Sequence, residues 1–189
     1  IDLRVYWNEK DKMLKLSLPI KFDVRNVCAQ DCFGIKDVST NGDEEVAQQW
    51  LLITDAVTGY AISCINQGSY GFDVREGCMR LSLLRSPAYA AHPIADRPLL
   101  SSDRYLPRID QGERHFRFEL NVGPEDSRLN LVGSEAQVFN EAPMALSMFP
   151  SGDSEKTKSF YEIEDPAILV SACKLAEVDD VLILRLYES

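Results

Sequence analysis

The chain has 189 residues, of which 45% are hydrophobic, and this is enough for one domain with a substantial core. Its formal net charge is −10, and such an acidic surface repels phosphate backbones, so we expect no nucleic-acid partner. No apolar run approaches the ~18 residues of a membrane-spanning helix, so we expect no membrane partner.

Two features concern the origin of the chain. It begins at Ile1 inside a strand-like pattern, without an initiator Met or a signal peptide, which predicts that it is internal to a longer protein. The number of cysteines is odd, at five, and most lie in apolar strand-like runs, which is typical of buried free thiols. They favour a reducing compartment such as the cytoplasm.

Alternating apolar and polar residues predict strands through the first half of the chain. Leu3, Val5 and Trp7 alternate, and residues 13–18 alternate again after a charged turn, so residues 2–18 are predicted to form a hairpin. Further strands are predicted at residues 21–24, 50–54 and 59–65. A second hairpin joins residues 70–74 to residues 78–84, with Gly77 at a positive-φ turn position.

The second half mixes strands with one helix. Residues 85–113 are proline-rich and aperiodic, which predicts a long functional loop. Residues 115–120 form a strand, apolar residues at helical spacing predict a short helix near 125–140, and residues 167–175 and 181–187 form a last hairpin. The prediction is a mainly β fold, an antiparallel β-sandwich with one short helix, as a single domain over residues 1–189.

Four sequence blocks occur in a recognisable order. They are YGFDV at 70–74 leading into LSLLRSP at 81–87, DQGE at 110–113 with FRF at 116–118, FN at 139–140 with Pro143, and SACKLAE at 171–177 with ILRLYE at 183–188. Together they resemble the C-terminal β region of the family 38 glycoside hydrolases, the α-mannosidases. The resemblance covers both ends of the chain and most of its middle, and implies a supersandwich-like fold.

The resemblance also implies a function. Family enzymes are retaining: one carboxylate attacks the anomeric carbon and another acts as acid and then base. Zinc, held by Asp and His of an upstream catalytic domain, orients the sugar hydroxyls. The chain therefore looks like an accessory domain of a larger multidomain α-mannosidase, which completes the active-site cleft for terminal α-mannosides. We expect no catalytic residue and no zinc ligand within it, and no activity of the chain alone.

Arg85 is the main candidate for contact with substrate. It directly follows an apolar strand, at a segment that resembles the family's approach to the cleft, and its guanidinium could donate hydrogen bonds to sugar hydroxyls. Tyr70 and Tyr89 are candidate stacking or hydrogen-bonding partners beside it. The alternative is a structural arginine that pairs with Asp73 or Asp110.

Other interpretations remain open. Asp110, Glu113 and His115 could supply metal ligands or a catalytic pair, although Asp110 is more typical of a turn cap. Tyr6, Trp7, Trp50, Tyr60 and Tyr89 could form a sugar platform, but packing in the core would explain them equally. The alternative function is a free-standing carbohydrate-binding or interaction module on a β-sandwich.

Overall fold

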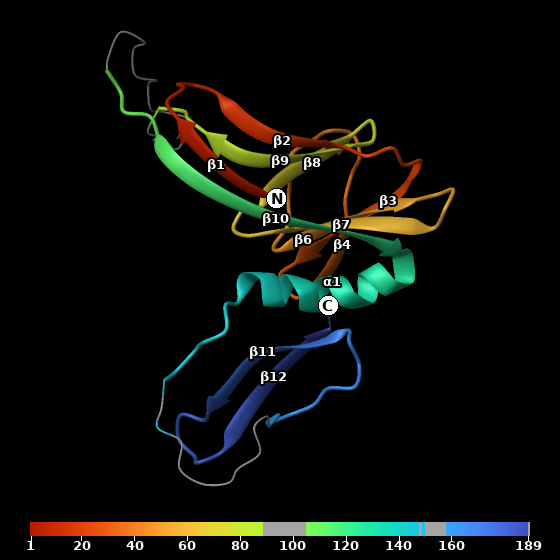
Figure 1. The fold of residues 1–189 in the computed structure, drawn as a ribbon, viewed down its shortest axis with the longest axis vertical. Coiled ribbons are helices and arrows are strands. Elements are labelled where there is room, and N and C mark those ends of the chain that lie inside the picture. Colours follow the sequence, from red (N-terminus) through yellow and green to blue (C-terminus); the bar gives the residue numbers. More distant parts are fainter. Residues whose placement is uncertain (89–104, 148, 150–157, 189) are drawn as a thin grey trace, which may run out of the picture.

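A computed structural model describes residues 1–88, 105–147, 149 and 158–188. Two antiparallel sheets face each other, a helix covers the outer face of the larger sheet, and a two-stranded sheet projects beyond the helix (Figure 1). The predicted β-sandwich with one helix is confirmed for the described residues.

The larger sheet has six strands. Their order is β1 (Asp2–Trp7), β10 (Gly112–Pro124), β7 (Tyr60–Asn66), β6 (Trp50–Asp55), β3 (Val24–Asp31) and β4 (Gly34–Asp37). β10 is long enough to serve two neighbours in turn: residues 112–117 pair with β1, and residues 118–124 pair with β7. The sheet therefore joins the start of the chain to a strand more than a hundred residues later.

The smaller sheet has four strands. Their order is β2 (Met13–Pro19), β9 (Cys78–Arg85), β8 (Gly71–Arg75) and β5 (Glu45–Val46). The main core fills the space between the two sheets, because alternate residues of each strand point inward. Its buried members include Val27, Leu51, Ile53, Phe72, Val74, Met79, Leu81 and Phe118.

Helix α1 (Glu125–Asn140) confirms the predicted helix and closes a second core on the outer face of the six-stranded sheet. Val132 and Ala136 of the helix pack with Trp50, Leu52 and Ile65 of β6 and β7. Since both faces of β6 are covered, all six of its residues are buried, and its first four, Trp50–Ile53, form a continuous apolar run. Within the described residues, no helix is long and apolar enough to cross a membrane.

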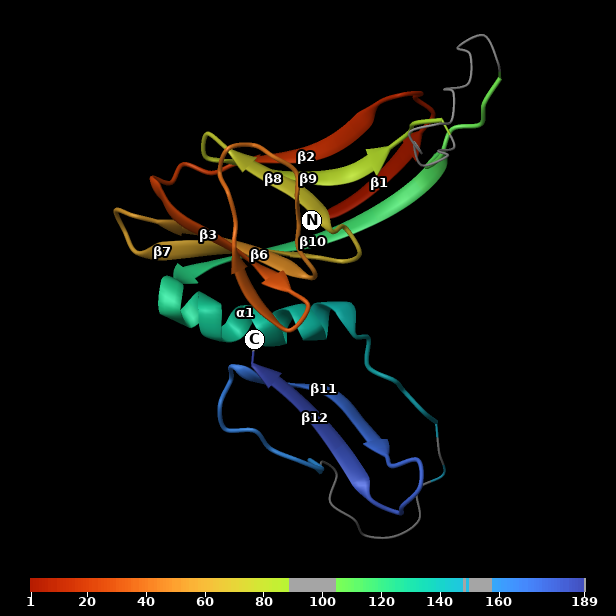
Figure 2. The ribbon, with the colours of Figure 1, turned by 180° about the vertical axis from the view of Figure 1, so that it is seen from behind.

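The last two strands, β11 (Ile168–Leu175) and β12 (Leu182–Glu188), form a separate two-stranded sheet. Both views show it extending away from α1 (Figures 1 and 2). It confirms the predicted last hairpin. The predicted hairpin of β8 and β9 is confirmed as well, with Glu76 and Gly77 at positive φ in a two-residue turn.

The predicted hairpin over residues 2–18 is wrong. β1 pairs with β10 in the larger sheet, and β2 pairs with β9 in the smaller one, so the turn between them crosses from one layer to the other. Alternation shows that a strand has one buried face but does not name its neighbour. The strand expected at residues 21–24 also begins later, at Val24.

Candidate functional site

The two described ends of the long loop are fastened to the β1–β2 turn. Ser86, which is fully buried, donates its backbone N–H to the Lys12 carbonyl at 2.9 Å and accepts from the Asp11 N–H at 2.7 Å. On the other side of the loop, Arg108 binds both carboxylate oxygens of Asp11, at 2.9 Å each. The hydrogen bond from Arg108 holds the pKa of Asp11 below its usual value. This frame fixes the positions of Arg85 and Asp110.

Arg85 and Asp110 line one hollow at the end of the smaller sheet. The hollow has a volume of about 460 Å³, within the range of small-molecule sites. Its polar lining comes from β5 and the residue before it, from β9 and from the loop, namely Glu44, Glu45, Ser82, Arg85 and Asp110. Its apolar lining comes from Met13, Val46, Leu83 and Leu84. A side chain at Gly71 would lie 3.2 Å from Ser82 Cβ, so the glycine keeps this lining open.

The Arg85 guanidinium and the Asp110 carboxylate are the free polar groups of this hollow. Among residues 1–88, 105–147, 149 and 158–188, neither side chain forms a hydrogen bond or an ion pair with another described residue. The alternative pairing of Arg85 with Asp73 is not found there, because Asp73 binds Lys15 and Arg80 instead. A free donor fork and a free acceptor lining one hollow suit a ligand that carries several hydroxyl groups.

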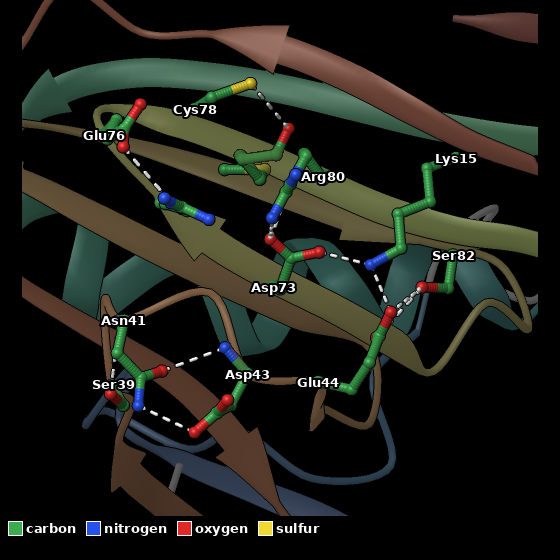
Figure 3. A network of polar contacts seen from close by, with 12 residues as sticks. Lys15, Ser39, Asn41, Asp43, Glu44, Asp73, Glu76, Cys78, Arg80 and Ser82 are labelled. Carbon is green, nitrogen blue, oxygen red and sulfur yellow. Dashed lines mark hydrogen bonds and ion pairs between the residues drawn. The ribbon is translucent and has the colours of Figure 1, made fainter.

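A network of polar contacts on the outer face of the smaller sheet holds part of the lining of this hollow in place. The Asp73 side chain is only 1% exposed and is held between Lys15 and Arg80, and Lys15 also binds Glu44 (Figure 3). Glu44 in turn accepts a hydrogen bond of 3.0 Å from Ser82. Burial of Lys15 opposes its charge, but the hydrogen bonds that Lys15 donates to the Asp73 and Glu44 carboxylates outweigh it and raise the Lys15 pKa. Glu44 and Ser82 are therefore held in place where they line the hollow.

Sequence reasoning missed most of this network, although part of it left a signal. A two-residue turn at Glu76 and Gly77 places Asp73 opposite Arg80, and the inward-facing Phe72 and Val74 put Asp73 on the outer face. The contacts of Lys15 and Glu44 depend on the pairing of β2 with β9 and of β5 with β8. No local sequence pattern predicts those two strand pairings.

The structure describes only one of the two tyrosines that were predicted as partners of Arg85. Tyr70 precedes Gly71 at the start of β8; its ring is exposed, and its carbonyl accepts the Ala47 N–H at 2.9 Å. Tyr70 thus lies one residue from the lining of the hollow. Tyr89 lies outside the described residues, as does His92.

Asp110, Glu113 and His115 do not form one cluster. Glu113 binds Arg4 at 2.8 Å and His115 at 2.9 Å on the β1–β10 pair, and these contacts, that to Arg4 first, lower the Glu113 pKa. A carboxyl with a lowered pKa is a poor general acid. In the part of the chain that the structure describes, no three His, Cys, Asp or Glu residues are grouped so as to hold a metal ion. Asp110 instead lines the hollow at φ 54°.

The aromatic candidates do not form one platform. Trp50 is fully buried in the core, as its packing alternative predicted. Tyr6 and Tyr60 are exposed, but Tyr6 lies opposite Glu113 and Tyr60 opposite Pro124, at the two ends of β10. At ~3.3 Å per residue, they are about 35 Å apart along the strand.

A second hollow beside α1 is larger, at about 530 Å³, but its charged groups are occupied. Arg117 binds Asp2 at 3.1 Å and covers the Phe139 ring at 5.1 Å. Glu135 binds Arg128 and accepts from Asn121. The hollow at Arg85 and Asp110 is therefore the better candidate for a polar ligand.

Comparison with known proteins places this geometry in a family. The alpha-mannosidase 2C1 of Mus musculus is 25% identical over 197 aligned positions, and that of Homo sapiens 26% over 196; each alignment covers 98% of this chain. The chain spans only 17% of the length of either relative.

Solved structures show the same fold. An alpha-mannosidase from Enterococcus faecalis V583 matches 99% of this chain with a TM-score of 0.79 at 15% identity, over 21% of its own length. A family 38 glycosyl hydrolase protein from Enterococcus faecalis matches with a TM-score of 0.64. The sequence model of the C-terminal domain of glycosyl hydrolases family 38 matches residues 1–96, and we conclude that the chain belongs to this family.

Proposed function

We propose that residues 1–189 are the accessory C-terminal β domain of a retaining α-mannosidase, which completes the active-site cleft formed by an upstream catalytic domain. The substrates would be terminal α-mannosides. Membership of the family and the names of the mouse and human relatives support the assignment to an α-mannosidase. The observation that carries the cleft role is the hollow in which Arg85 and Asp110 are both free.

The chemistry of the hollow fits recognition of a sugar. A guanidinium donates two parallel hydrogen bonds, so Arg85 can donate to hydroxyl oxygens of a mannose ring. A carboxylate accepts hydrogen bonds from vicinal hydroxyls, so Asp110 can accept from the hydroxyl groups of the same ring. Asp73 anchors the supporting network through its ion pair with Lys15. Glu44 and Ser82, which this network holds in place, are therefore positioned before a ligand binds. Their role would be to orient the sugar, while bond cleavage takes place on the catalytic domain.

Zinc would belong to the catalytic domain. The described residues offer no group of three ligands that could hold it, so they do not fit a zinc site. We therefore assign no step through a metal to this chain. Its contribution would be hydrogen bonds to hydroxyl groups and one wall of the cleft.

The test compares this chain with the longer polypeptide that contains it, in a zinc-supplemented p-nitrophenyl α-mannoside assay. Hydrolysis by the longer polypeptide alone is the expected result. In that protein, Arg85→Ala should lower kcat/KM about 10- to 100-fold, since a hydrogen bond to a charged group contributes roughly 1.5–3 kcal/mol.

Arg75→Ala is the matched control. Arg75 lies on the same hairpin but at its other end, and its side chain is exposed; among the described residues, its guanidinium binds only the neighbouring Glu76, at 3.2 Å. Its replacement should leave kcat/KM unchanged. Equal losses in both variants would argue against the cleft role. Mannoside binding by the short chain without any activity of the longer protein would favour a free-standing carbohydrate-binding module.

A further inference from the structure

One face of the two-stranded sheet is apolar over most of its length, from Val170 and Leu186 to the turn between the strands. The register pairs Leu175 with Leu182, Cys173 with Leu184 and Val170 with Leu186, and paired residues share a face. We call this set, completed by Ile168, the hairpin face; its apolar members are Ile168, Val170, Cys173, Leu175, Leu182, Leu184 and Leu186. Glu188, which pairs with Ile168, places one charge at the base of this face. The opposite face is mixed, because it carries Lys174 and Arg185.

The hairpin face is largely open to solvent. Leu175 and Leu182 are 65% and 64% exposed, and Leu186 and Leu184 are 49% and 40% exposed. The sheet is held to the rest of the protein mainly at its base, where Tyr187 meets Phe33 at 5.6 Å between ring centroids and Gln137 donates to the Val170 carbonyl at 3.2 Å. The distal half extends away from the helix (Figure 2).

Such an arrangement is unfavourable without a partner. An isolated two-stranded hairpin has marginal stability, and a continuous apolar face with few charges is typical of a contact surface. A strand pair that faced water on this side would carry polar residues there, as the opposite face does in part. The sequence of the hairpin face is therefore that of a buried sheet surface.

The area of the hairpin face indicates whether its partner is a second copy of the chain or another part of the same polypeptide. Two strands of about eight residues, with a rise of ~3.3 Å per residue, present a face of roughly 250 Å². Two copies meeting there would bury roughly 500 Å², well below the ~1,200 Å² of a stable interface. A partner in the same polypeptide needs far less area, because its effective concentration is in the millimolar range.

We infer that the hairpin face docks on an apolar surface from another part of the same polypeptide, outside residues 1–189. The relatives leave ample chain to supply it, since this chain spans 17% of their length. The inference rests on the proposed function only in placing the chain within a longer protein. It adds a second contact region, on the opposite side of α1 from the hollow at Arg85.

Cys173 is a natural reporter of this docking, because it is an exposed free thiol on the hairpin face. Iodoacetamide labelling, followed by peptide mass spectrometry, measures its reactivity in the short chain and in the longer polypeptide. We expect Cys173 to react at least about tenfold more slowly in the longer protein. The exposed thiol of Cys32, in the β3–β4 turn, should react similarly in both.

A pair of variants in the longer protein tests which face is covered. Leu184 and Ile183 are neighbours of equal exposure, 40%, on opposite faces of β12. Leu184→Ser should restore the labelling of Cys173, whereas Ile183→Ser should not. Equal reactivity of Cys173 in both proteins would overturn the inference, and so would protection in the short chain that rises with its concentration, since that indicates a second copy. Neither readout depends on mannoside hydrolysis, so the failure of one proposal is distinct from the failure of the other.

Discussion

Asp73 shows how one buried charge organises the outer face of the smaller sheet. Its carboxylate is nearly inaccessible to water and lies between two cations, Lys15 and Arg80. Asp73→Asn keeps the shape but removes the charge, and leaves Arg80 without an acidic partner among the described residues. We expect a loss of about 2–3 kcal/mol in the free energy of unfolding, measured by urea titration.

Asp2→Asn is the control for this prediction. Asp2 also pairs with an arginine, Arg117, but its side chain is 81% exposed. Its replacement should change the unfolding free energy by no more than about 0.5 kcal/mol. If the two variants are equally stable, the Asp73 network contributes nothing beyond an ordinary surface pair.

The buried thiol of Cys64 makes stability depend on pH. Burial raises its pKa to about 12, whereas a thiol in the unfolded chain ionises near pH ~8.5. Between these values the unfolded chain has lost a proton that the folded protein keeps, so the free energy of unfolding falls as the pH rises. The slope is about 1.4 kcal/mol per pH unit for each such thiol.

Cys64→Ala removes that slope. The variant should be less stable than the parent at pH 8, and the difference should shrink by about 2 kcal/mol at pH 10. Urea titrations under reducing conditions measure it. A constant difference for Cys64→Ala would mean that this thiol ionises equally in both states.

At the scale of elements, the turn of the β8–β9 hairpin is the most constrained. Gly77 has φ 68°, and a Cβ added there would lie 2.9 Å from the Ile20 carbonyl oxygen. Gly68 has φ 78°, with nothing within 4 Å of an added Cβ. Gly68→Ala should therefore cost about 1 kcal/mol, for left-handed backbone strain alone.

Gly77→Ala should cost at least about 1 kcal/mol more, because the clash also displaces the hydrogen bond from the Ile20 N–H to the Gly77 carbonyl. Thermal and urea unfolding of the two variants, side by side, measure the difference. Similar losses would show that the strand before Ile20 yields to the new methyl group at little cost.

An element could be predicted from the sequence when the interactions that form it lie within a few residues of each other. The β8–β9 turn, the final hairpin and α1 were predicted because Gly77, the apolar runs and the helical spacing of Leu129, Val132 and Ala136 act within a few residues. The partner of β1 was not predicted, since cross-strand pairs such as Arg4 with Glu113 join residues 109 positions apart. The hollow combines such distant contributions, so of its lining residues only Arg85 was proposed for contact with substrate. Asp110 was named in advance, but as a turn cap, a metal ligand or catalytic group, or a partner of Arg85.

At the scale of the whole molecule, the sandwich with α1 should fold without the two-stranded sheet. Both cores lie within residues 3–139, and among the described residues the last sheet is joined to this body at its base, through the Phe33–Tyr187 ring contact and the hydrogen bond from Gln137 to Val170. We expect a chain ending at residue 147 to unfold cooperatively within about 1 kcal/mol of the full chain. Circular dichroism during urea titration measures it, and a collapse of the transition would show that residues 1–189 are one folding unit.

The division of β10 between β1 and β7 has a consequence for how the protein folds. The first strand of the chain must wait for residues 112–117 before it finds a neighbour in its sheet. Closing a loop of this length is slow, because the chain loses conformational entropy before any contact compensates for the loss. Folding in milliseconds to seconds is typical of β folds with such distant pairings. During synthesis at roughly 5–20 residues per second, β1 would remain unpaired for several seconds after it leaves the ribosome. Its charged outer residues, Asp2 and Arg4, would help to keep that waiting strand from pairing with other chains.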